Sequence, residues 1–498
     1  MPPLFLREVT LQERSKEDKG VVRNLGNMPT PEEGFQGILK CEPEEAQVGE
    51  EVVVTGEELP RESRFKLLWR THSVDWKIER NADGVLWQRF FGFEHEERQR
   101  IVAEPETDSE GKFRHKFKIP EDFGGLHDLY LLSSEKRINK VGVRIIRSFE
   151  VTPTSGPLGR EINITAHGLP LPAANFVDNS IFHIYYDNKY TGLISPVTPK
   201  GRADFSIPAT GRPGTHIVDV ERSQFGNAHS YRQTHIGLTP LPGTPDLSWK
   251  FEVTDGEAQL PPPIEKQVPD IVPRRNAELT DNGDPELTTN RWAIPVDSSV
   301  KVIGAGFPKK TEYKLVWPEL EGSNIREEAF KEKNSVIVGG KTDADGRLAA
   351  EMKPAPRTVQ GGPHPIHAFV DGEKLATTST VVLPVFQELS RKEGPVGSQI
   401  TINAQGVGWN EIWNQVTILY DNSFIGYACG GDIPGIIEAK LRATGEPGWH
   451  LIDIYPTIQK QRNFAEEAFE IPFIYRLPFL NWDSHPQGYH FRYAFKIE

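Results

Sequence analysis

The stretch VTPTSGPLGREINITAHG (151–168) returns later in the chain as LSRKEGPVGSQITINAQG (389–406), with Gly156 matching Gly394. In both copies a Gly-Pro turn leads into a segment whose apolar residues alternate with polar ones. Alternation with a period of two turns one face of a strand toward a core and the other toward water. The stretch therefore predicts an antiparallel β-strand that the chain uses twice.

The duplication continues on both sides of this stretch. Downstream, FHIYYDNKYTG (182–192) matches VTILYDNSFIG (416–426), and GRPGTHIVDV (211–220) matches GEPGWHLIDI (445–454). Upstream, EVVVTGEELPRESRFKLLW (51–69) matches SVKVIGAGFPKKTEYKLVW (299–317). Because the matches keep the same order along the chain, they indicate a tandem copy of one two-domain unit.

A weaker repeat inside each unit divides the chain into quarters. Every quarter contains a Gly-centred turn and a strand with a G-x-H pattern, whose histidines are His127, His216, His364 and His450. Short strands bounded by Gly, Pro, Asn and Asp, in quarters of about 100 residues, are typical of β-sandwiches. Four copies of one histidine at equivalent strand positions favour a repeated structural role over catalysis.

We therefore predict an all-β protein of four tandem immunoglobulin-like β-sandwich domains, arranged as a duplicated two-domain unit with extended N- and C-terminal arms. The only helical turns expected are HEERQRI (95–101) and SNIREEAFKEK (323–333). The predicted segments are an N-terminal arm (1–35), domain one with an aromatic insertion (36–147), domain two (148–240), a Pro-rich linker (241–291), domain three (292–385), domain four (386–476) and a C-terminal arm (477–498).

Composition and charge narrow the classes of function that the chain could have. The 498 residues carry a formal net charge of −13 and show no basic patch, which disfavours nucleic-acid binding. No apolar run is long enough for a membrane helix, so membrane insertion is not expected. The two cysteines form neither a disulfide framework nor a metal-binding pair. The first 20 residues lack the pattern of a secretory signal peptide, and none is expected.

The order of these motifs resembles the IPT/TIG-type immunoglobulin-like repeats of bacterial and archaeal surface proteins. The likeness rests on the G-P-x-G entry, the alternating strand ending in Gly, the Y-D-N turn and the G-x-H strand, and it is clearest in domains two and four. The resemblance implies the sandwich fold. Such domains occur in adhesins, surface-layer proteins, phage virion proteins and accessory domains of secreted enzymes, so it leaves the function open.

The sequence offers little for catalysis or metal binding. It lacks the nucleophile elbow, HExxH, phosphate-loop and dinucleotide-binding patterns, so we expect no catalytic residues and no enzyme. Asp343 and Asp345 resemble the start of a calcium loop, but the twelfth position of that loop would be Pro354 instead of Glu. A tight turn is therefore favoured, with calcium as the only cofactor considered.

Aromatic residues in the domain-one insertion, in domain four and in the C-terminal arm are the candidates for contact with other molecules. Exposed aromatics mark protein interfaces, and their faces also stack on sugars. A local mini-core under the long insertion is the alternative. The terminal segment alternates aromatic and polar residues, so it predicts a strand that could join the sheet of another subunit or, alternatively, pack onto the chain's own linker. The candidates are Trp76, Trp87, Phe91, Phe93, Trp409, Trp413, Tyr489, Phe491, Tyr493 and Phe495.

These observations predict a non-enzymatic structural subunit of an extracellular assembly, most simply a virion or phage-like particle. Its partners would be other copies of itself or other subunits. One alternative is a surface-layer or adhesin protein of a prokaryotic cell. Another is a carbohydrate-binding accessory protein, with surface glycans as partners. All three place the protein on an extracellular particle or at the cell surface.

Overall fold

A computed structural model gives the structure of the chain. It describes residues 35–80, 88–169, 182–194, 200–222, 247–267, 279, 283–291, 293–321, 331–353, 361–408, 415–430, 435–460, 475–478, 480–481 and 490–498.

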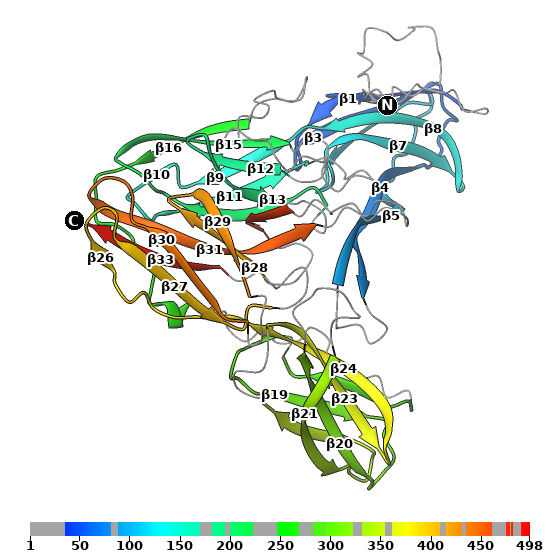
Figure 1. The fold of residues 1–498 in the computed structure, drawn as a ribbon. Coiled ribbons are helices and arrows are strands. Elements are labelled where there is room, and N and C mark those ends of the chain that lie inside the picture. Colours follow the sequence, from blue (N-terminus) through cyan, green and yellow to red (C-terminus); the bar gives the residue numbers. More distant parts are fainter. Residues whose placement is uncertain are drawn as a thin grey trace, which may run out of the picture.

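Each quarter of the chain forms a sandwich of a three-stranded sheet and a larger one, which has five strands in domains one to three and six in domain four. Figure 1 shows the four sandwiches. In domain one the sheets have the orders β1-β3-β6 and β2-β8-β7-β4-β5. All neighbours are antiparallel except the short β2, which pairs with β8 in parallel. The strands are β1 (Ile38–Glu42), β2 (Glu45–Ala46), β3 (Glu51–Glu57), β4 (Lys66–Arg80), β5 (Gln88–Ala103), β6 (Phe113–Lys118), β7 (Gly125–Ser133) and β8 (Lys136–Ile145).

Domain two repeats this arrangement with the orders β14-β11-β9 and β10-β16-β15-β12-β13. The strands are β9 (Ser148–Thr152), β10 (Ser155–Gly156), β11 (Glu161–His167), β12 (Phe182–Tyr186), β13 (Lys189–Ile194), β14 (Ala203–Pro208), β15 (Gly214–Arg222) and β16 (Leu247–Val253). One 3₁₀ turn, η3 (Ile264–Lys266), follows in the linker.

Domain three has the orders β17-β19-β22 and β18-β24-β23-β20-β21. The strands are β17 (Glu286–Thr289), β18 (Ala293–Pro295), β19 (Val300–Ala305), β20 (Glu312–Glu321), β21 (Lys331–Lys341), β22 (Leu348–Met352), β23 (Gly362–Val370) and β24 (Glu373–Leu383).

Domain four has the orders β25-β27-β30 and β26-β33-β31-β28-β29, with β32 pairing an extension of β31. The strands are β25 (Val385–Phe386), β26 (Glu393–Gly394), β27 (Gln399–Gln405), β28 (Gln415–Tyr420), β29 (Ser423–Cys429), β30 (Ile437–Arg442), β31 (Gly448–Lys460), β32 (Tyr475–Pro478) and β33 (Phe491–Ile497). The prediction of four immunoglobulin-like sandwiches is thus confirmed.

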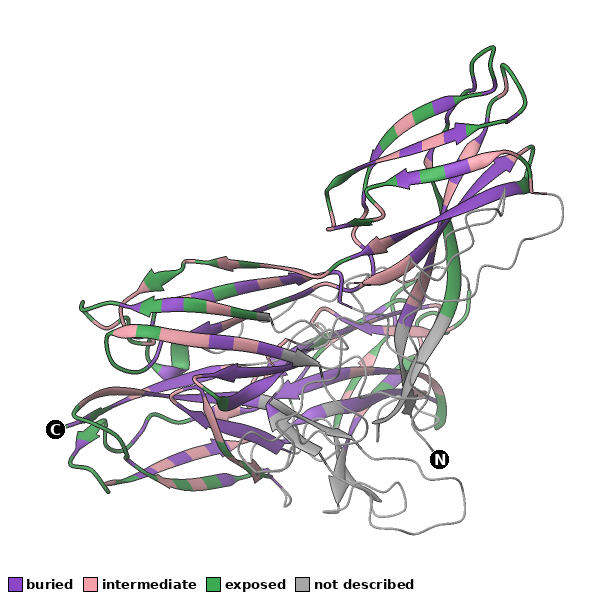
Figure 2. Ribbon diagram, turned by 90° about the horizontal axis from the view of Figure 1, so that it is seen from above, coloured by how far each residue is buried: buried purple, intermediate pink, exposed green. Residues whose placement is uncertain are grey.

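The alternating segments build the cores as predicted. Ile162, Ile164 and Ala166 of β11 are at most 1% exposed, while the residues between them face outward. Figure 2 shows the same alternation along the three-stranded sheets, with exposed residues gathered at the turns. The pattern fails at Phe182–Tyr186, where every residue is buried. His183 and Tyr185, on the other face of this strand, are 0% exposed, so they do not face water.

The last strand of each inner domain lies beyond its predicted boundary. β16 falls in the predicted linker, and β33 falls in the predicted C-terminal arm. Both occupy the same place in their sheets, between a long strand and a two-residue parallel strand. A long connection separates each from the strand it pairs with. In the linker, KFEVTDG (250–256) has the pattern of a strand that could join a neighbouring sheet, and residues 250–253 do so as part of β16.

The helical turn predicted at 95–101 is wrong, because these residues continue β5. A hairpin ladder with β4 supplies their backbone partners, and this tertiary context overrides local propensity. The other predicted helical segment, 323–333, lies mostly outside the described residues, and its last residues begin β21.

Domains two and four lie side by side, whereas domains one and three project from them (Figure 1). Each outer domain meets its inner neighbour at a glycine contact. A Cβ on Gly124 would lie 1.8 Å from the Gly168 carbonyl oxygen, and one on Gly361 would lie 1.6 Å from that of Gly406. Only glycine allows this approach, so both copies of the unit use the same close junction.

Candidate functional site

A histidine and an aspartate close a turn in domain two. His216 Nδ1 lies 2.5 Å from Asp187 Oδ2, and its Nε2 lies 2.8 Å from the Arg212 carbonyl oxygen. The other oxygen of Asp187 accepts the N–H of Ile217 at 2.9 Å. The cluster thus ties the turn after β12 to the start of β15.

Domain four repeats this cluster. His450 Nδ1 lies 2.6 Å from Asp421 Oδ2, and Nε2 lies 2.8 Å from the Glu446 carbonyl oxygen. The N–H of Leu451 donates to Asp421 Oδ1 at 2.9 Å. The ring of Tyr420 stacks on His450 at 5.4 Å. Duplication has preserved the geometry.

Both imidazoles are favoured in their charged form, because each ring nitrogen faces an acceptor oxygen. The hydrogen bond to Asp187 raises the pKa of His216 above its ordinary value. Burial opposes the charge on His450, but the bond to Asp421 raises the pKa of that ring as well. A general base needs a free ring nitrogen near its substrate, and neither ring offers one. The pairs therefore hold turns.

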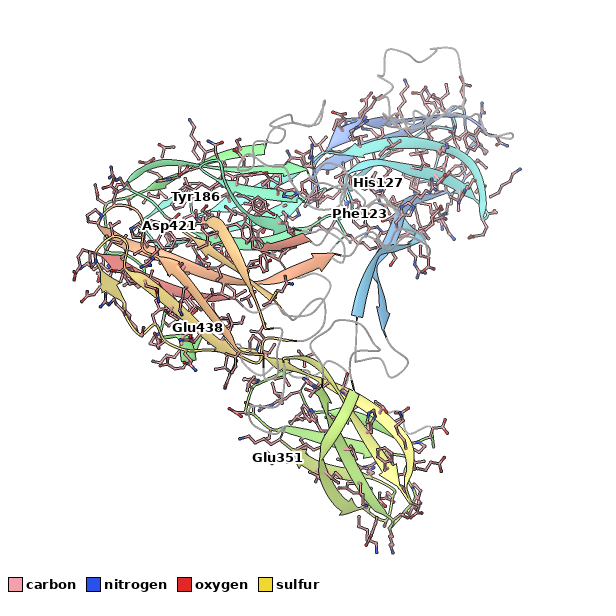
Figure 3. All side chains as sticks on the ribbon, viewed as in Figure 1. Phe123, His127, Tyr186, Glu351, Asp421 and Glu438 are labelled. Atoms are coloured by element: carbon pink, nitrogen blue, oxygen red, sulfur yellow. The ribbon has the colours of Figure 1, made fainter. Side chains whose placement is uncertain are left out.

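Domain one uses its buried carboxylate in the same structural way. Asp122 accepts hydrogen bonds from the Trp69 indole at 2.8 Å and from the Thr71 hydroxyl at 2.6 Å. The ring of His127 stacks on Trp69 at 4.6 Å, and its Nε2 lies 2.6 Å from the Phe123 carbonyl oxygen. Figure 3 shows Phe123 and His127 together on this side of domain one. The cluster braces the loop that leads to the glycine junction.

Domains two and four contact each other through equivalent positions. Arg212 forms an ion pair with Glu446 at 2.6 Å, and these residues match in the duplication. Tyr190 and Phe424 also match, and their rings meet edge to face at 6.2 Å. Contacts between equivalent positions are the signature of a two-fold arrangement. The inner domains therefore form a pseudo-two-fold pair within one chain.

The turn between β28 and β29 of domain four reaches into domain two through its second residue, Asn422. Asn422 donates through Nδ2 to the Pro208 carbonyl at 2.7 Å, and its own carbonyl accepts from the Thr191 hydroxyl at 2.8 Å. In Figure 3, Asp421 beside it lies near Tyr186 of domain two. The outer sheet faces are accordingly buried at His183, Tyr185, Tyr190, Thr191 and Leu193 in domain two, and at Gln415, Thr417, Leu419, Asp453 and Tyr455 in domain four.

An ion cluster crosses the same interface. Arg492, 7% exposed, donates through Nε to Asp453 at 2.5 Å and through Nη1 to Glu161 of domain two. His490 lies 2.7 Å from the same Asp453 oxygen. Complete burial favours the neutral acid, but the charges of Arg492 and His490 hold the pKa of Asp453 below its ordinary value.

The linker seals the open side of β33. The Gln267 amide donates to the Arg492 carbonyl and accepts the Arg492 N–H, both at 2.7 Å, as a neighbouring strand would. A small cavity of about 160 Å³ remains beside it, between Pro261–Pro263, Glu388 and Trp449. Its size and partly apolar walls suit a junction between linker and domain.

The structure corrects the predicted role of the aromatic terminal strand. Phe491, Tyr493 and Phe495 are between 0% and 4% exposed and belong to the core of domain four. Their strand completes the sheet of its own chain between β26 and β31, so these rings are not an exposed contact face. An alternating aromatic strand has the same local pattern in either setting.

The remaining aromatic candidates are placed only in part. The backbones of Trp76, Phe91 and Phe93 belong to the long β4–β5 hairpin, which projects from domain one, but their side chains lie outside the description. Trp87, Trp409, Trp413 and Tyr489 lie outside the described residues altogether. Their contact role stays a prediction.

Asp343 acts as a turn former. Its Oδ1 accepts the N–H groups of Asp345 at 2.9 Å and Arg347 at 2.8 Å, and these backbone bonds lower its pKa. Asp108 makes the same bonds in domain one. Within the described ranges, no group of three or more His, Cys, Asp or Glu side chains could hold a metal ion. The described part of the chain also contains no helix of the length and apolarity that crossing a membrane requires.

Comparisons with known proteins give distant likenesses only. No protein-family model matches the chain, and no curated protein matches it. Among solved structures, native Escherichia coli alpha-2-macroglobulin is 9% identical with a TM-score of 0.18, and the alignment covers 93% of this chain and 32% of that one. This chain thus spans about a third of that protein's length.

Two further structures have multidomain chains of similar extent. An ICAM-5 D1–D4 ectodomain fragment is 12% identical with a TM-score of 0.18, covering 89% of this chain and 99% of that one. FdeC, an adhesin of Escherichia coli, is 11% identical with a TM-score of 0.16, covering 71% and 99%. Likenesses this distant carry no argument about function, which must therefore be argued from the chain itself.

Proposed function

We propose that this chain is a non-enzymatic structural protein that works through its surfaces, as a subunit of an extracellular assembly or cell surface. The observation that carries the proposal is the pseudo-two-fold pair of domains two and four, fixed by the Asn422 contacts and the Arg492 cluster. The pair forms a firm centre from which domains one and three project (Figure 1). Such a frame holds the two projecting domains apart and leaves their surfaces available for contact with other molecules.

The chemistry of the described clusters supports this proposal. The His–Asp pairs, Asp122 and Arg492 use their hydrogen-bonding atoms to hold turns and domain contacts. Where titratable groups serve catalysis, they converge on a cavity that a substrate can enter. The carboxylates and histidines of these clusters bond to backbone groups and to one another, so their placement fits a structural role.

A virion or phage-like particle is the specific assembly we propose, and a prokaryotic surface layer or adhesin is the other candidate. Kinship with IPT/TIG-type repeats is part of the same proposal and rests on the sequence motifs. Antibodies against the purified chain would test it by immunogold electron microscopy and by density-gradient fractionation of the producing culture. Label on released particles supports a virion, and label on the cell envelope supports a surface protein. A chain found only in the soluble cell interior overturns the proposal.

A further inference from the structure

The edge strand of the large sheet in domain three is open. β21 pairs with β20 along its whole length, and no described strand pairs with its other side. Ile337, near its middle, is 58% exposed and lies opposite the partly buried Val316. An open edge with an exposed branched apolar residue is a template for pairing with another strand.

The equivalent strand in domain one is protected, which makes the comparison informative. Ile101 of β5 faces Leu68 just as Ile337 faces Val316, one residue before the matching tryptophans. The preceding residues of β5, Glu96–Arg100, are exposed and largely charged, and they form ion pairs along the edge. Residues 335–340 of β21 read SVIVGG and carry no charge. Charged edges resist pairing between chains, so the centre of β21 lacks the protection that β5 has, although Lys331, Glu332, Lys333 and Lys341 lie at the two ends of β21.

The chain itself shows how this edge associates. In the pair of domains two and four, the strands equivalent to β21 are β13 and β29, and they lie against each other. Tyr190 and Phe424, which meet there, occupy matching positions on these two strands. The strand at this place in the sandwich therefore already packs against its own counterpart, through the outer sheet face, without strand pairing and with pseudo-two-fold symmetry.

We propose that domain three binds domain three of a second copy of this chain, edge to edge through β21. The two strands would run antiparallel about a two-fold axis and join the five-stranded sheets into one. Each Ile337 would then be covered by the partner strand, and its exposed apolar surface would be removed from water. The inference rests on the proposed function, since it names one of the contacts by which the subunits would assemble.

Sedimentation of the purified full chain, over concentrations up to about 200 µM, tests this contact directly. We expect a reversible dimer, with hydrogen exchange in the peptide spanning β21 slowing as the dimer forms. Ile337→Lys would place like charges across the axis and should weaken dimerisation on the order of 100-fold. The matched control, Ile101→Lys at the equivalent position of domain one, should leave it unchanged.

Because Ile337 is exposed, its replacement should not affect folding, and an unchanged melting temperature would verify this. A chain that stays monomeric at every concentration overturns the inference. So does a dimer that Ile101→Lys disrupts as strongly as Ile337→Lys, or one in which β21 exchanges as fast as in the monomer. None of these results bears on particle or envelope labelling, so failure here leaves the proposed function standing.

Discussion

Replacing Arg492 by methionine should destabilise the central pair of domains strongly. The side chain is 7% exposed and its main partner, Asp453, is fully buried. Methionine fills a similar volume but leaves the Asp453 charge with His490 as its only cationic neighbour. Breaking a buried ion pair by removing one partner costs about 3–5 kcal/mol of unfolding free energy, because the remaining charge is still buried.

The paired domains together have the size of a 150–250-residue unit, for which 1 kcal/mol moves the melting temperature by about 2–4 °C. We therefore expect Arg492→Met to lower the melting temperature of this unit by about 6–20 °C in differential scanning calorimetry. Arg202→Met is the matched control, since Arg202 and its partner Asp204 are 44% and 54% exposed. An exposed pair of this kind contributes about 0–1 kcal/mol.

A second substitution separates a lost contact from a stranded charge. Adding Asp453→Asn to Arg492→Met removes the buried charge, so the double variant should regain much of the lost stability. Lowering the pH should also reduce the stability deficit of Arg492→Met. In the native protein the depressed pKa of Asp453 stabilises the fold above the carboxyl's unfolded pKa, and this is lost as the pH falls. In Arg492→Met burial dominates and raises that pKa, so the deficit should shrink from pH 7 to pH 5. A loss no larger than that of Arg202→Met, or a double variant no more stable than Arg492→Met, would refute this reasoning.

Three further predictions concern the turns and junctions. The pKa values of His216 and His450 are raised in the folded state, so the stability that these residues contribute should be full below the ordinary histidine pKa and should decline as the pH rises through the raised values. Calorimetry from pH 6 to pH 9 should show this decline in stability, and the double variant His216→Asn/His450→Asn should show a smaller decline. Gly361→Ala, whose Cβ would lie 1.6 Å from the Gly406 carbonyl oxygen, should force domains three and four apart and change the small-angle X-ray scattering profile, whereas Gly426→Ala, with open space around its Cβ, should leave the profile unchanged. Asp343→Ala should lower the melting temperature of domain three more than Asp345→Ala does, since only Asp343 accepts two backbone N–H groups, and equal effects would argue against the turn.

The sequence was sufficient for the fold because the sandwiches obey local rules. Strand β11 shows its buried face through the alternation of Ile162, Ile164 and Ala166, and the matching strand of domain four repeats it. The duplication then assigned four domains without any long-range pairing having to be known. Turn glycines added the boundaries between strands, since many of them adopt the positive φ that other residues avoid.

The domain contacts escaped prediction because they depend on which surfaces meet. The strand Phe182–Tyr186 differs from a half-exposed strand only in that His183 and Tyr185 are buried. Histidine and tyrosine are also common on exposed strand faces, so their residue types do not show the burial. A nearly unbroken apolar and aromatic run, buried on both sides, was the available signal. The contact role predicted for the terminal aromatic strand was wrong for the same reason. Periodicity shows that one face of a strand is apolar, but it does not show which surface covers that face. Arg492 had no sequence signal at all, because its partner Glu161 lies in another domain.

The Arg492 cluster also explains why the central pair is asymmetric. Position 492 faces Asp453 on the neighbouring strand, and the matching position in domain two is Ser248, which faces Asp219. Ser248 donates a hydrogen bond to Asp219 and stays exposed, whereas Arg492 reaches across to domain two. Two identical sandwiches could pair equally well with copies of themselves in other chains. Arg492 is present in domain four only. Pairing of domain two with domain four is therefore more favourable than pairing of either domain with a copy of itself, because any other partner would leave this buried charge uncompensated. The charged group therefore favours a pair that closes within one chain. On this view Arg492→Met/Asp453→Asn, made together with Ile337→Lys to weaken the β21 contact, should stay folded yet form exchanged dimers on gel filtration, and a strictly monomeric variant would count against it.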